Sequence, residues 1–513
     1  MDNQTPKTKS PAGKAQTIPA LLDLDAALDA FRCTVIPLLD PDEEADWDGT
    51  QLAAQEQIIL RAALVLAGQC IAILLQRLVG SLAVQGTALE RTQPLRQATS
   101  VGHGKRWVNI TVIGGVCVPL RVEYVVARKP RNGSGRKRKR GQRGASQEQG
   151  FYPVLALLGI ADRLSPLVRS LVAEHGNLAV SFAAACATLA QIGISMSVKR
   201  IARVTNAFNQ MGLQQRQCWI EQYRQGSLPT GTHLKGQRVV ISVDGGRTRI
   251  RRAKRGRRRQ SGHHGYHTDW REPKLLIIYV LDELGRKIKQ GTIPITNAGT
   301  FGGVEAFIDV LGMHLTRLGI KHASHVHLIG DGAPWIWERI PALLRQLGCA
   351  AECISEAIDF CHAAGKLNDF AQLAFTSQSK AQAWFRKQRR LLKLCEFDKQ
   401  GQLGQVLSHL ERQIAQAQAS SRKDMQTIYD YFVKHQHRMA YHQFTASALP
   451  IGSGAVESLI RQVVNLRLKS AGRFWLEPNA EGTLLARYWW AAGQWKQFCD
   501  SILTAGLTPV PSN

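Results

Sequence analysis

Two aspartates directly follow apolar, β-branched segments and directly precede glycine. Asp244 ends the segment QRVVISVD, and Asp331 ends the segment HASHVHLIGD. In an open α/β sheet, ligands collect at the carboxyl ends of the strands, so these two carboxylates converge if their strands are neighbours. Asp-Gly is also a common turn signal, which remains the alternative for each aspartate taken alone.

Glu457 is the third candidate, at the start of a predicted helix. A capping box from Ser453 would place its glutamate at position 456, which is Val456, so capping does not explain Glu457. Helical spacing predicts an apolar face made of Val456, Leu459, Ile460, Val463 and Leu466. It also predicts an adjacent polar strip made of Glu457, Arg461, Asn465 and Lys469. Either this strip is an exposed surface with a Glu–Arg pair, or Glu457 faces the aspartates and the basic residues meet phosphates.

Three converging carboxylates suit metal-dependent phosphodiester chemistry. Oxygen ligands select hard ions such as Mg²⁺ or Mn²⁺. Two such ions about 4 Å apart activate the attacking oxygen and stabilise the leaving oxygen. Without metal, the carboxylates would repel one another and raise one another's pKa. We therefore expect Asp244, Asp331 and Glu457 to be catalytic residues and ligands of two metal ions.

The elements around these residues follow an α/β order from about residue 236. QRVVISVD is a strand, EPKLLIIYVLDELGRKIKQGTIPI gives two more strands around the turn at 283–285, and HASHVHLIGD is a fourth. Helical periodicity at 301–318 and 334–347 alternates with these strands, and AAECISEAIDF is a candidate fifth strand. This order predicts an α/β RNase H-like catalytic core at 236–370 and 449–500, interrupted by a helical insertion at 371–448.

The residues before this core are predicted to be mostly helical, with one small β-sheet. The predicted units are a disordered tail at 1–20, a helical unit at 21–90, a small β unit at 91–130, a basic linker at 131–150 and a helical unit at 151–235. In the last of these, two helices flank a short turn at 192–196. The second helix begins with Lys199, Arg200 and Arg203, so it is either the DNA-reading part of a helix-turn-helix or half of an ordinary helical hairpin.

The chain of 513 residues carries a formal charge of +27, which favours a polyanionic partner, with double-stranded DNA the usual one. We expect no membrane association, because the apolar stretch Ala62–Leu75 is too short to span a bilayer and the first residues do not resemble a secretion signal. We therefore expect a cytoplasmic protein. The run at 247–259 has nine basic residues in thirteen positions. It is either a solvated loop or a phosphate-contacting segment, and the latter assigns DNA contacts to Arg247, Arg249, Arg251 and Arg252.

Three further groups of residues have a structural and a functional interpretation. Cys349, Cys353 and Cys361 lie near His362 in sequence but lack the paired spacing of structural zinc sites, so free thiols are expected. The histidines in SGHHGYH, at 263, 264 and 267, are expected to lie in a loop near DNA. Trp335 and Trp337 are expected in the core, with a stacking wall for an unpaired base as the alternative.

The segments SVDGG, GDGAPWIW, DFCH and GSGAVESLIRQVVNLRLKSAGRFW resemble the signature blocks of DDE transposases from bacterial insertion sequences, related to the Mutator-like superfamily. The resemblance covers about residues 236–495. It implies an RNase H-like core with Asp244, Asp331 and Glu457 as the DDE triad and a helical insertion between the last two. It also implies that Asp359-Phe360-Cys361-His362 is a C/DxxH motif that supports the active site or DNA binding, with His362 counted among the catalytic residues.

The resemblance implies a transposase that binds the ends of its insertion sequence, cleaves DNA and transfers strands, as a homo-oligomer on DNA. The basic run after Asp244 is longer than the resemblance leads us to expect. Two alternatives remain: a structure-specific nuclease or resolvase with the same fold, and a catalytically silent DNA-binding repressor. The presence of all three acids disfavours the repressor.

Overall fold

The computed structural model describes two compact units, formed by residues 1–171, 186–197 and 506–513 and by residues 172–185 and 198–505. The described residues are 23–40, 47–96, 100–127, 150–254, 265–289, 293, 295–394, 403–469 and 472–505. The predicted tail at 1–20, residues 131–149 of the predicted linker, His263 and His264 lie outside the described residues.

The N-terminal unit packs helices against a β-hairpin. Its elements are α1 (Leu24–Val35), α2 (Gly49–Gly80), α3 (Leu82–Arg91), β1 (Ser100–Thr111), β2 (Cys117–Ala127) and α4 (Pro153–Leu157). Asp48 begins α2 with a capping box, in which its carboxylate accepts the backbone N–H groups of Thr50 and Gln51. Apolar residues of α2 and of both strands share one hydrophobic core. The predicted separate units at 21–90 and 91–130 are therefore packed together.

Helix α2 is longer than the apolar stretch Ala62–Leu75 suggests. It extends over 32 residues and contains an 18-residue window with a mean hydropathy of 2.4, so by length and composition alone it could cross a membrane. The argument that this segment is too short is therefore wrong for the helix as a whole. Only 22% of that window is buried within the structure, although Ala72, Leu75 and Val79 lie in the core shared with the hairpin.

The second unit is built on a five-stranded mixed sheet. Its strands are β3 (Arg238–Gly245), β6 (Lys274–Leu281), β7 (Thr296–Thr300), β8 (His325–Gly330) and β9 (Ile354–Ile358), in the spatial order β7-β6-β3-β8-β9. β6 is antiparallel to β3 and β7, whereas β8 is parallel to β3 and β9. β7 begins after the segment in which the third strand was predicted, whose residues 290–292 and 294 are outside the described residues.

Alternating residues of β3 enter two cores on opposite faces of the sheet. Val239, Ile241 and Val243 pack with α8 (Gly303–Leu318) and α9 (Pro334–Gln346). Val240 packs on the other face with residues of α15 (Gly454–Ile460) and α16 (Glu477–Ala491). This alternation follows from the two-residue repeat of a strand. The sheet is therefore covered on both faces, and its strand ends are left to carry polar groups.

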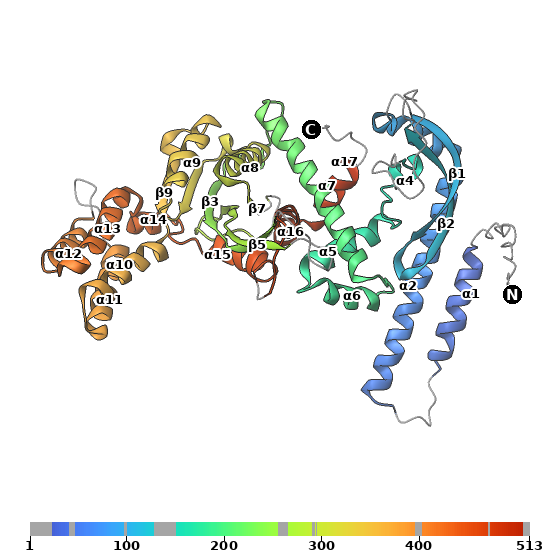
Figure 1. The fold of residues 1–513 in the computed structure, drawn as a ribbon, viewed down its shortest axis with the longest axis horizontal. Coiled ribbons are helices and arrows are strands. Elements are labelled where there is room, and N and C mark those ends of the chain that lie inside the picture. The colour runs from blue at the N-terminus through green and yellow to red at the C-terminus, as the bar shows by residue number, and fades with distance from the viewer. Residues whose placement is uncertain are drawn as a thin grey trace, which may run out of the picture. The chain divides into compact units, whose positions relative to one another are not determined.

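The predicted helical insertion forms a group of helices beyond the β9 edge of the sheet, as Figure 1 shows. Its helices are α10 (Phe360–Ala374), α11 (Gln378–Leu394), α12 (Gly404–Ala415), α13 (Ala419–His435) and α14 (Tyr441–Ala446), so the group begins at Phe360, before the predicted start at residue 371. Their apolar residues join the core on the α8 and α9 face of the sheet. The insertion is therefore packed continuously with the sheet.

The predicted final helix is broken soon after it starts. α15 ends at Ile460 and continues as a π-helical turn at Arg461–Asn465. The wider turn changes which side chains face inward: Val464 is fully buried, and Leu466 is 58% exposed. The predicted inward position of Leu466 is therefore wrong, whereas Glu457, Arg461, Asn465 and Lys469 of the predicted polar strip are all exposed.

The remaining described strands and α-helices are a two-stranded ribbon and four helices. A two-stranded ribbon of β4 (Thr248–Ala253) and β5 (Tyr266–Arg271) leaves the sheet between β3 and β6. The helices α5 (Pro166–Leu178), α6 (Phe182–Gln191), α7 (Val198–Arg224) and α17 (Trp495–Ala505) complete the described fold. The predicted second helix of the helix-turn-helix is thus 27 residues long, and buried residues along it make it a packing element of the second unit.

Candidate active site

Asp244 and Asp331 lie at the same level on neighbouring parallel strands. β3 and β8 pair with Ser242 opposite Ile329, and each aspartate comes two residues later. Both carboxylates therefore lie at the carboxyl edge of the sheet, as expected from the apolar segments that precede them. The Asp244 carboxylate accepts its neighbour Gly245 N–H at 2.6 Å, and the Asp331 carboxylate accepts Ala333 N–H at 2.9 Å.

Glu457 and His362 approach Asp244 from two helices. The pKa of Asp244 is raised to about 6, mainly by burial and to a smaller extent by the charges of Asp331 and Glu457. The Gly245 N–H bond and His362 act in the opposite direction. Three carboxylates and one imidazole are therefore close enough to influence one another, which makes the ionised form of Asp244 unfavourable without a cation.

Asp359 connects the elements that carry this group. Its carboxylate accepts the backbone N–H of His362 at 2.8 Å, capping α10, and also the backbone N–H of Ser453, which begins α15. Its own backbone N–H donates to the carbonyl of Gly330 at 2.8 Å, next to Asp331. The side chain is fully buried. One residue thus holds the end of β8 and the starts of the His362 and Glu457 helices together.

The donor set suits a hard divalent cation. The ligand atoms of Asp359, His362 and Glu457 lie within 4.8 Å of one another. The predicted ligands Asp244 and Asp331 lie outside this gathered set, and Asp244 interacts with Asp331, Glu457 and His362 through their charges. A cation would offset the cost of ionising Asp244, which comes mainly from burial and in smaller part from the neighbouring carboxylates. The residues present therefore fit Mg²⁺ or Mn²⁺.

A stability measurement tests this electrostatic arrangement. Because the pKa of Asp244 is about 6 in the fold against an ordinary value of 3.8, its ionised carboxyl destabilises the fold above pH 6. Well below pH 3.8 the carboxyl is protonated in both states and the cost is absent. We expect Asp244→Asn to stabilise the metal-free protein by about 1–3 kcal/mol at pH 8 and to leave it nearly unchanged at about pH 2.5.

Thermal melts at both pH values, with and without Mg²⁺, measure this effect. Mg²⁺ should raise the melting temperature of the wild type more than that of the variant, because binding to the folded state stabilises it. Asp424→Asn, at an exposed position of α13, is the control. If Asp244→Asn has the same melting temperature as the wild type at pH 8, ionised Asp244 does not destabilise the fold, which contradicts the prediction.

Tyr431 of the helical insertion lies beside the segment that carries Asp331. Tyr431 of α13 lies against Gly332, where no side chain would fit, and burial raises the pKa of its hydroxyl with the help of Asp331 and Asp359. Trp337 donates its indole N–H to the backbone carbonyl of Asp331 at 2.8 Å and is 8% exposed. The expectation that Trp337 belongs to the core is confirmed, and the insertion helps to shape the site.

The ribbon separates the four predicted DNA-binding arginines into two sets. Residues opposite one another in an antiparallel pair share a face, so Arg249 and Arg251 lie with Trp270 and Thr268. Arg247 continues this face by strand alternation. Arg252 lies on the other face and forms an ion pair with Asp269 at 3.5 Å. The interpretation of this run as a solvated loop does not hold for residues 248–253, which form a strand.

The other predicted DNA-binding residues are dispersed. Arg461 and Lys469 are exposed, on the π-helical turn and after it. Lys199 and Arg203 are exposed in the first turns of α7, and Arg200 is half-buried. These three residues lie on a helix that contributes none of the carboxylates.

A basic helix of the insertion was not predicted as a DNA-binding element. α11 carries six basic residues and no acid, and all six are exposed: Lys380, Arg386, Lys387, Arg389, Arg390 and Lys393. The Arg389 guanidinium lies 5.4 Å from the ring centroid of Phe360, the residue that follows Asp359 and begins α10. The charge pattern QSKAQAWFRKQRRLLKL is visible in the sequence, but its position beside α10 is not.

Metal-binding alternatives are not supported among the described residues. The nine described cysteines are free, and the one gathered set of possible ligands there is Asp359, His362 and Glu457. Cys349 is buried and Cys361 is exposed. Where described, the cysteine cluster therefore behaves as the expected free thiols.

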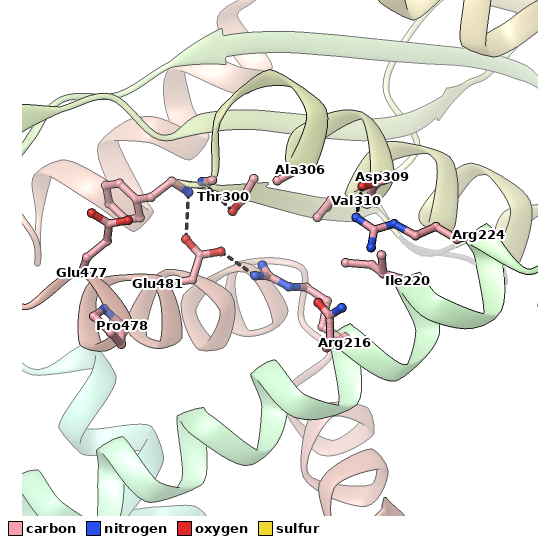
Figure 2. A pocket seen from close by; sticks show the side chains of 13 residues that line it. Arg216, Ile220, Arg224, Thr300, Ala306, Asp309, Val310, Glu477, Pro478 and Glu481 are labelled. Carbon is pink, nitrogen blue, oxygen red and sulfur yellow. Dashed lines mark hydrogen bonds and ion pairs between the residues drawn. The ribbon is translucent and has the colours of Figure 1, made fainter. Parts of the chain in front are cut away.

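A separate cavity of about 350 Å³ lies between α7, α8 and α16. Figure 2 shows Glu481 reaching between Arg216 and the end of β7. Glu481 accepts from Arg216 at 2.5 Å and from the Phe301 N–H at 2.8 Å, and Arg224 pairs with Asp309 at 2.5 Å. These charged groups of the cavity wall are thus already paired with one another. The cavity therefore lies where the three helices pack together.

Comparisons with known proteins find no match: no family, no curated protein and no solved structure is detectably similar to this chain.

Proposed function

We propose that the protein is a DDE-type DNA transposase, a metal-dependent enzyme that cleaves DNA at the ends of an insertion sequence and joins the freed strand to target DNA. The observation that carries this proposal is the group formed by Asp244, Asp331 and Glu457. Two of these carboxylates lie at the same level at the ends of adjacent parallel strands, and the charge of the third acts on Asp244 from α15. The charge of +27 supports a nucleic-acid substrate.

The strand arrangement supports an RNase H-like core as part of the same proposal. Three antiparallel strands precede two parallel ones, with helices between the later strands, and the first strand is central. This is the arrangement that the order of elements in the sequence predicts. The helices α10–α14 lie between Asp331 and Glu457 in the chain, where the resemblance to DDE transposases implies an insertion.

The chain's own groups account for most of the proposed chemistry. When bound, divalent ions would activate the attacking oxygen and stabilise the leaving oxygen, with Asp244, Asp331 and Glu457 as ligands. The Gly245 and Ala333 N–H groups orient the two aspartates. Asp359 fixes the helices that carry His362 and Glu457, and exposed basic residues beside the group hold the DNA phosphates.

The decisive experiment uses DNA that contains the sequences flanking the gene. Purified protein, this DNA, a target plasmid and Mg²⁺ should give cleavage at both flanks and joining of the 3′-hydroxyl ends to the plasmid. Cleavage without joining supports the nuclease or resolvase alternative. Specific binding to the flanks without either reaction, at all Mg²⁺ and Mn²⁺ concentrations, supports the silent repressor and contradicts the proposal.

The basic helix α11 gives a prediction about DNA binding. Binding to a phosphate releases counterions, so the log–log slope of affinity against salt changes by about 0.9 for each phosphate-binding residue that is removed. We expect Arg386→Ala, Lys387→Ala and Arg390→Ala together to weaken binding to all duplex DNA and to lower this slope by about 2–3. Fluorescence anisotropy across a salt series measures the slope.

The control for this experiment replaces three exposed basic residues elsewhere, Lys235, Lys321 and Arg345, with alanine. If both triple variants change the slope equally, binding follows net charge rather than a defined α11 surface. If the α11 variant keeps the wild-type slope, α11 is a solvated helix.

A further inference from the structure

The β4–β5 ribbon has one face that is buried and one that is not. Thr248 and Ile250 are 0% and 1% exposed, and the Thr248 hydroxyl donates to the Leu468 carbonyl at 2.9 Å. Backbone hydrogen bonds between Arg249, Arg251 and Trp475 attach β4 to the body of the unit. The ribbon is therefore attached to the unit through β4 and through the face that carries Thr248 and Ile250. Its opposite face is directed away from the core.

Arginine and aromatic side chains share the outward face. Trp270 is 48% exposed and Tyr266 is 43% exposed, although burying a large aromatic side chain is normally favourable. Arg249 lies 4.9 Å from the centre of the Trp270 ring, and Arg247 lies 5.6 Å from it. Arg251 lies 6.0 Å from the centre of the Tyr266 ring. The Phe474 ring lies beside them, 5.7 Å from that of Tyr266.

The charge of this face is all of one sign within the two strands. Asp269, the acid of β5, lies on the other face and pairs with Arg252. The three arginines on the outward face are held by cation–π contacts, which leave guanidinium N–H groups able to bind phosphate oxygens. Aromatic rings alternating with phosphate-binding groups match the alternation of bases and phosphates along a single nucleic-acid strand.

We propose that this face binds an unpaired segment of DNA, with bases stacked on Trp270 and Tyr266 and phosphates bound by Arg247, Arg249 and Arg251. The bases of an intact duplex offer no free ring face, so the aromatic part of this surface selects unpaired nucleotides. Arg247 is three residues from Asp244, so the unpaired nucleotides lie next to the proposed cleavage position. The inference rests on the proposed function for the source of this DNA, the frayed or displaced end of the substrate.

Binding of two probes by the full-length protein tests this inference, with EDTA present so that no cleavage occurs. The probes are a single-stranded oligodeoxythymidylate and a blunt-ended, GC-rich DNA duplex of equal charge. Stacking on one aromatic ring corresponds to about a 10-fold to 100-fold change in affinity. We expect Trp270→Ala to weaken single-strand binding by this factor and duplex binding by less than about 3-fold. Trp270→Phe should restore most of the affinity for the single strand.

Two controls make the result specific. Trp107→Ala removes a tryptophan that is 37% exposed on β1, in the other unit, and should change neither affinity. Tyr266→Ala gives a second, independent variant of the ribbon and should also affect the single strand selectively. Equal weakening for both probes would mean that the ribbon contacts phosphates only, and unchanged affinity in both ribbon variants would mean that the face does not bind DNA; each result overturns the inference.

The outcome is separable from that of the proposed function. Protein that binds the single strand through Trp270 but never cleaves DNA would leave this inference standing and remove the transposase proposal. Protein that cleaves and joins DNA with Trp270→Ala at wild-type affinity for both probes would do the reverse.

Discussion

Asp244→Asn, Asp331→Asn and Glu457→Gln should each lower metal-dependent DNA cleavage by about 10³-fold or more, while DNA affinity stays within about 2-fold of the wild type. Each amide keeps the shape of the side chain and removes one charge that would bind metal. None of the three is placed to bind a phosphate directly, since like charges repel. Single-turnover cleavage at saturating DNA and Mg²⁺ measures the effect.

Glu338→Gln is the matched control, because Glu338 is an exposed acid of α9, on the helix that follows Asp331. It should leave cleavage unchanged. If any one of the three variants keeps wild-type cleavage while the control does too, that residue does not belong to the catalytic group. The remaining two carboxylates would then have to be assigned to a different kind of site.

Asp359→Ala should lower cleavage by about 10²-fold, because it releases the starts of both helices that carry site residues. It leaves the backbone N–H of Ser453 without its buried acceptor and removes the cap of α10. These changes should also lower the free energy of unfolding by about 1–3 kcal/mol. Asp359 is thus a positioning residue, and the Mg²⁺ concentration needed for half-maximal cleavage should rise as cleavage falls.

Asp48→Ala separates positioning from stability. Asp48 also caps a helix, α2, but lies in the N-terminal unit. Its replacement should lower the melting temperature and leave cleavage and the Mg²⁺ requirement unchanged. Asp359→Asn, which keeps one carbonyl oxygen as an acceptor, should restore part of the activity. A fall in stability for Asp359→Ala with an unchanged Mg²⁺ requirement would show that Asp359 only stabilises the fold.

The strand ends are predictable because their signal is local. An apolar run that ends in Asp-Gly marks both the strand and its functional end, so a few residues are enough to find each of Asp244 and Asp331. That β3 and β8 are neighbours depends on the order of all the elements, which the sequence also contains. Both observations need only the chain's periodicity.

The ribbon is hard to predict because its composition conceals its period. Arginine occupies both faces of β4, so the alternation of buried Thr248 and Ile250 with exposed arginines resembles an unstructured basic run. The π-helical turn at Arg461–Asn465 escapes prediction for a similar reason. The wider π-helical turn rotates the residues that follow it, and the spacing of apolar residues in the sequence does not reveal this rotation. The rotation nevertheless decides which side chains after Glu457 are buried.

The role of Asp359 cannot be predicted from its own neighbourhood. Its resemblance to a motif marks it as part of a site, but its bond to Ser453 joins residues that are 94 positions apart. Only the folded insertion, α10–α14, brings those positions together. Contacts of this kind depend on packing, which sequence periodicity does not encode.

The most direct test of the central claim is to change the metal preference of the site by changing one ligand. Asp331→Cys replaces a hard carboxylate with a softer thiolate, which binds Mg²⁺ poorly and Mn²⁺ better. We expect this variant to be inactive in DNA cleavage with Mg²⁺ and to regain a measurable part of its activity with Mn²⁺, while Glu338→Cys stays active with both ions. Full activity of Asp331→Cys with Mg²⁺, or wild-type cleavage in EDTA, would contradict the proposal that Asp331 binds a catalytic metal ion.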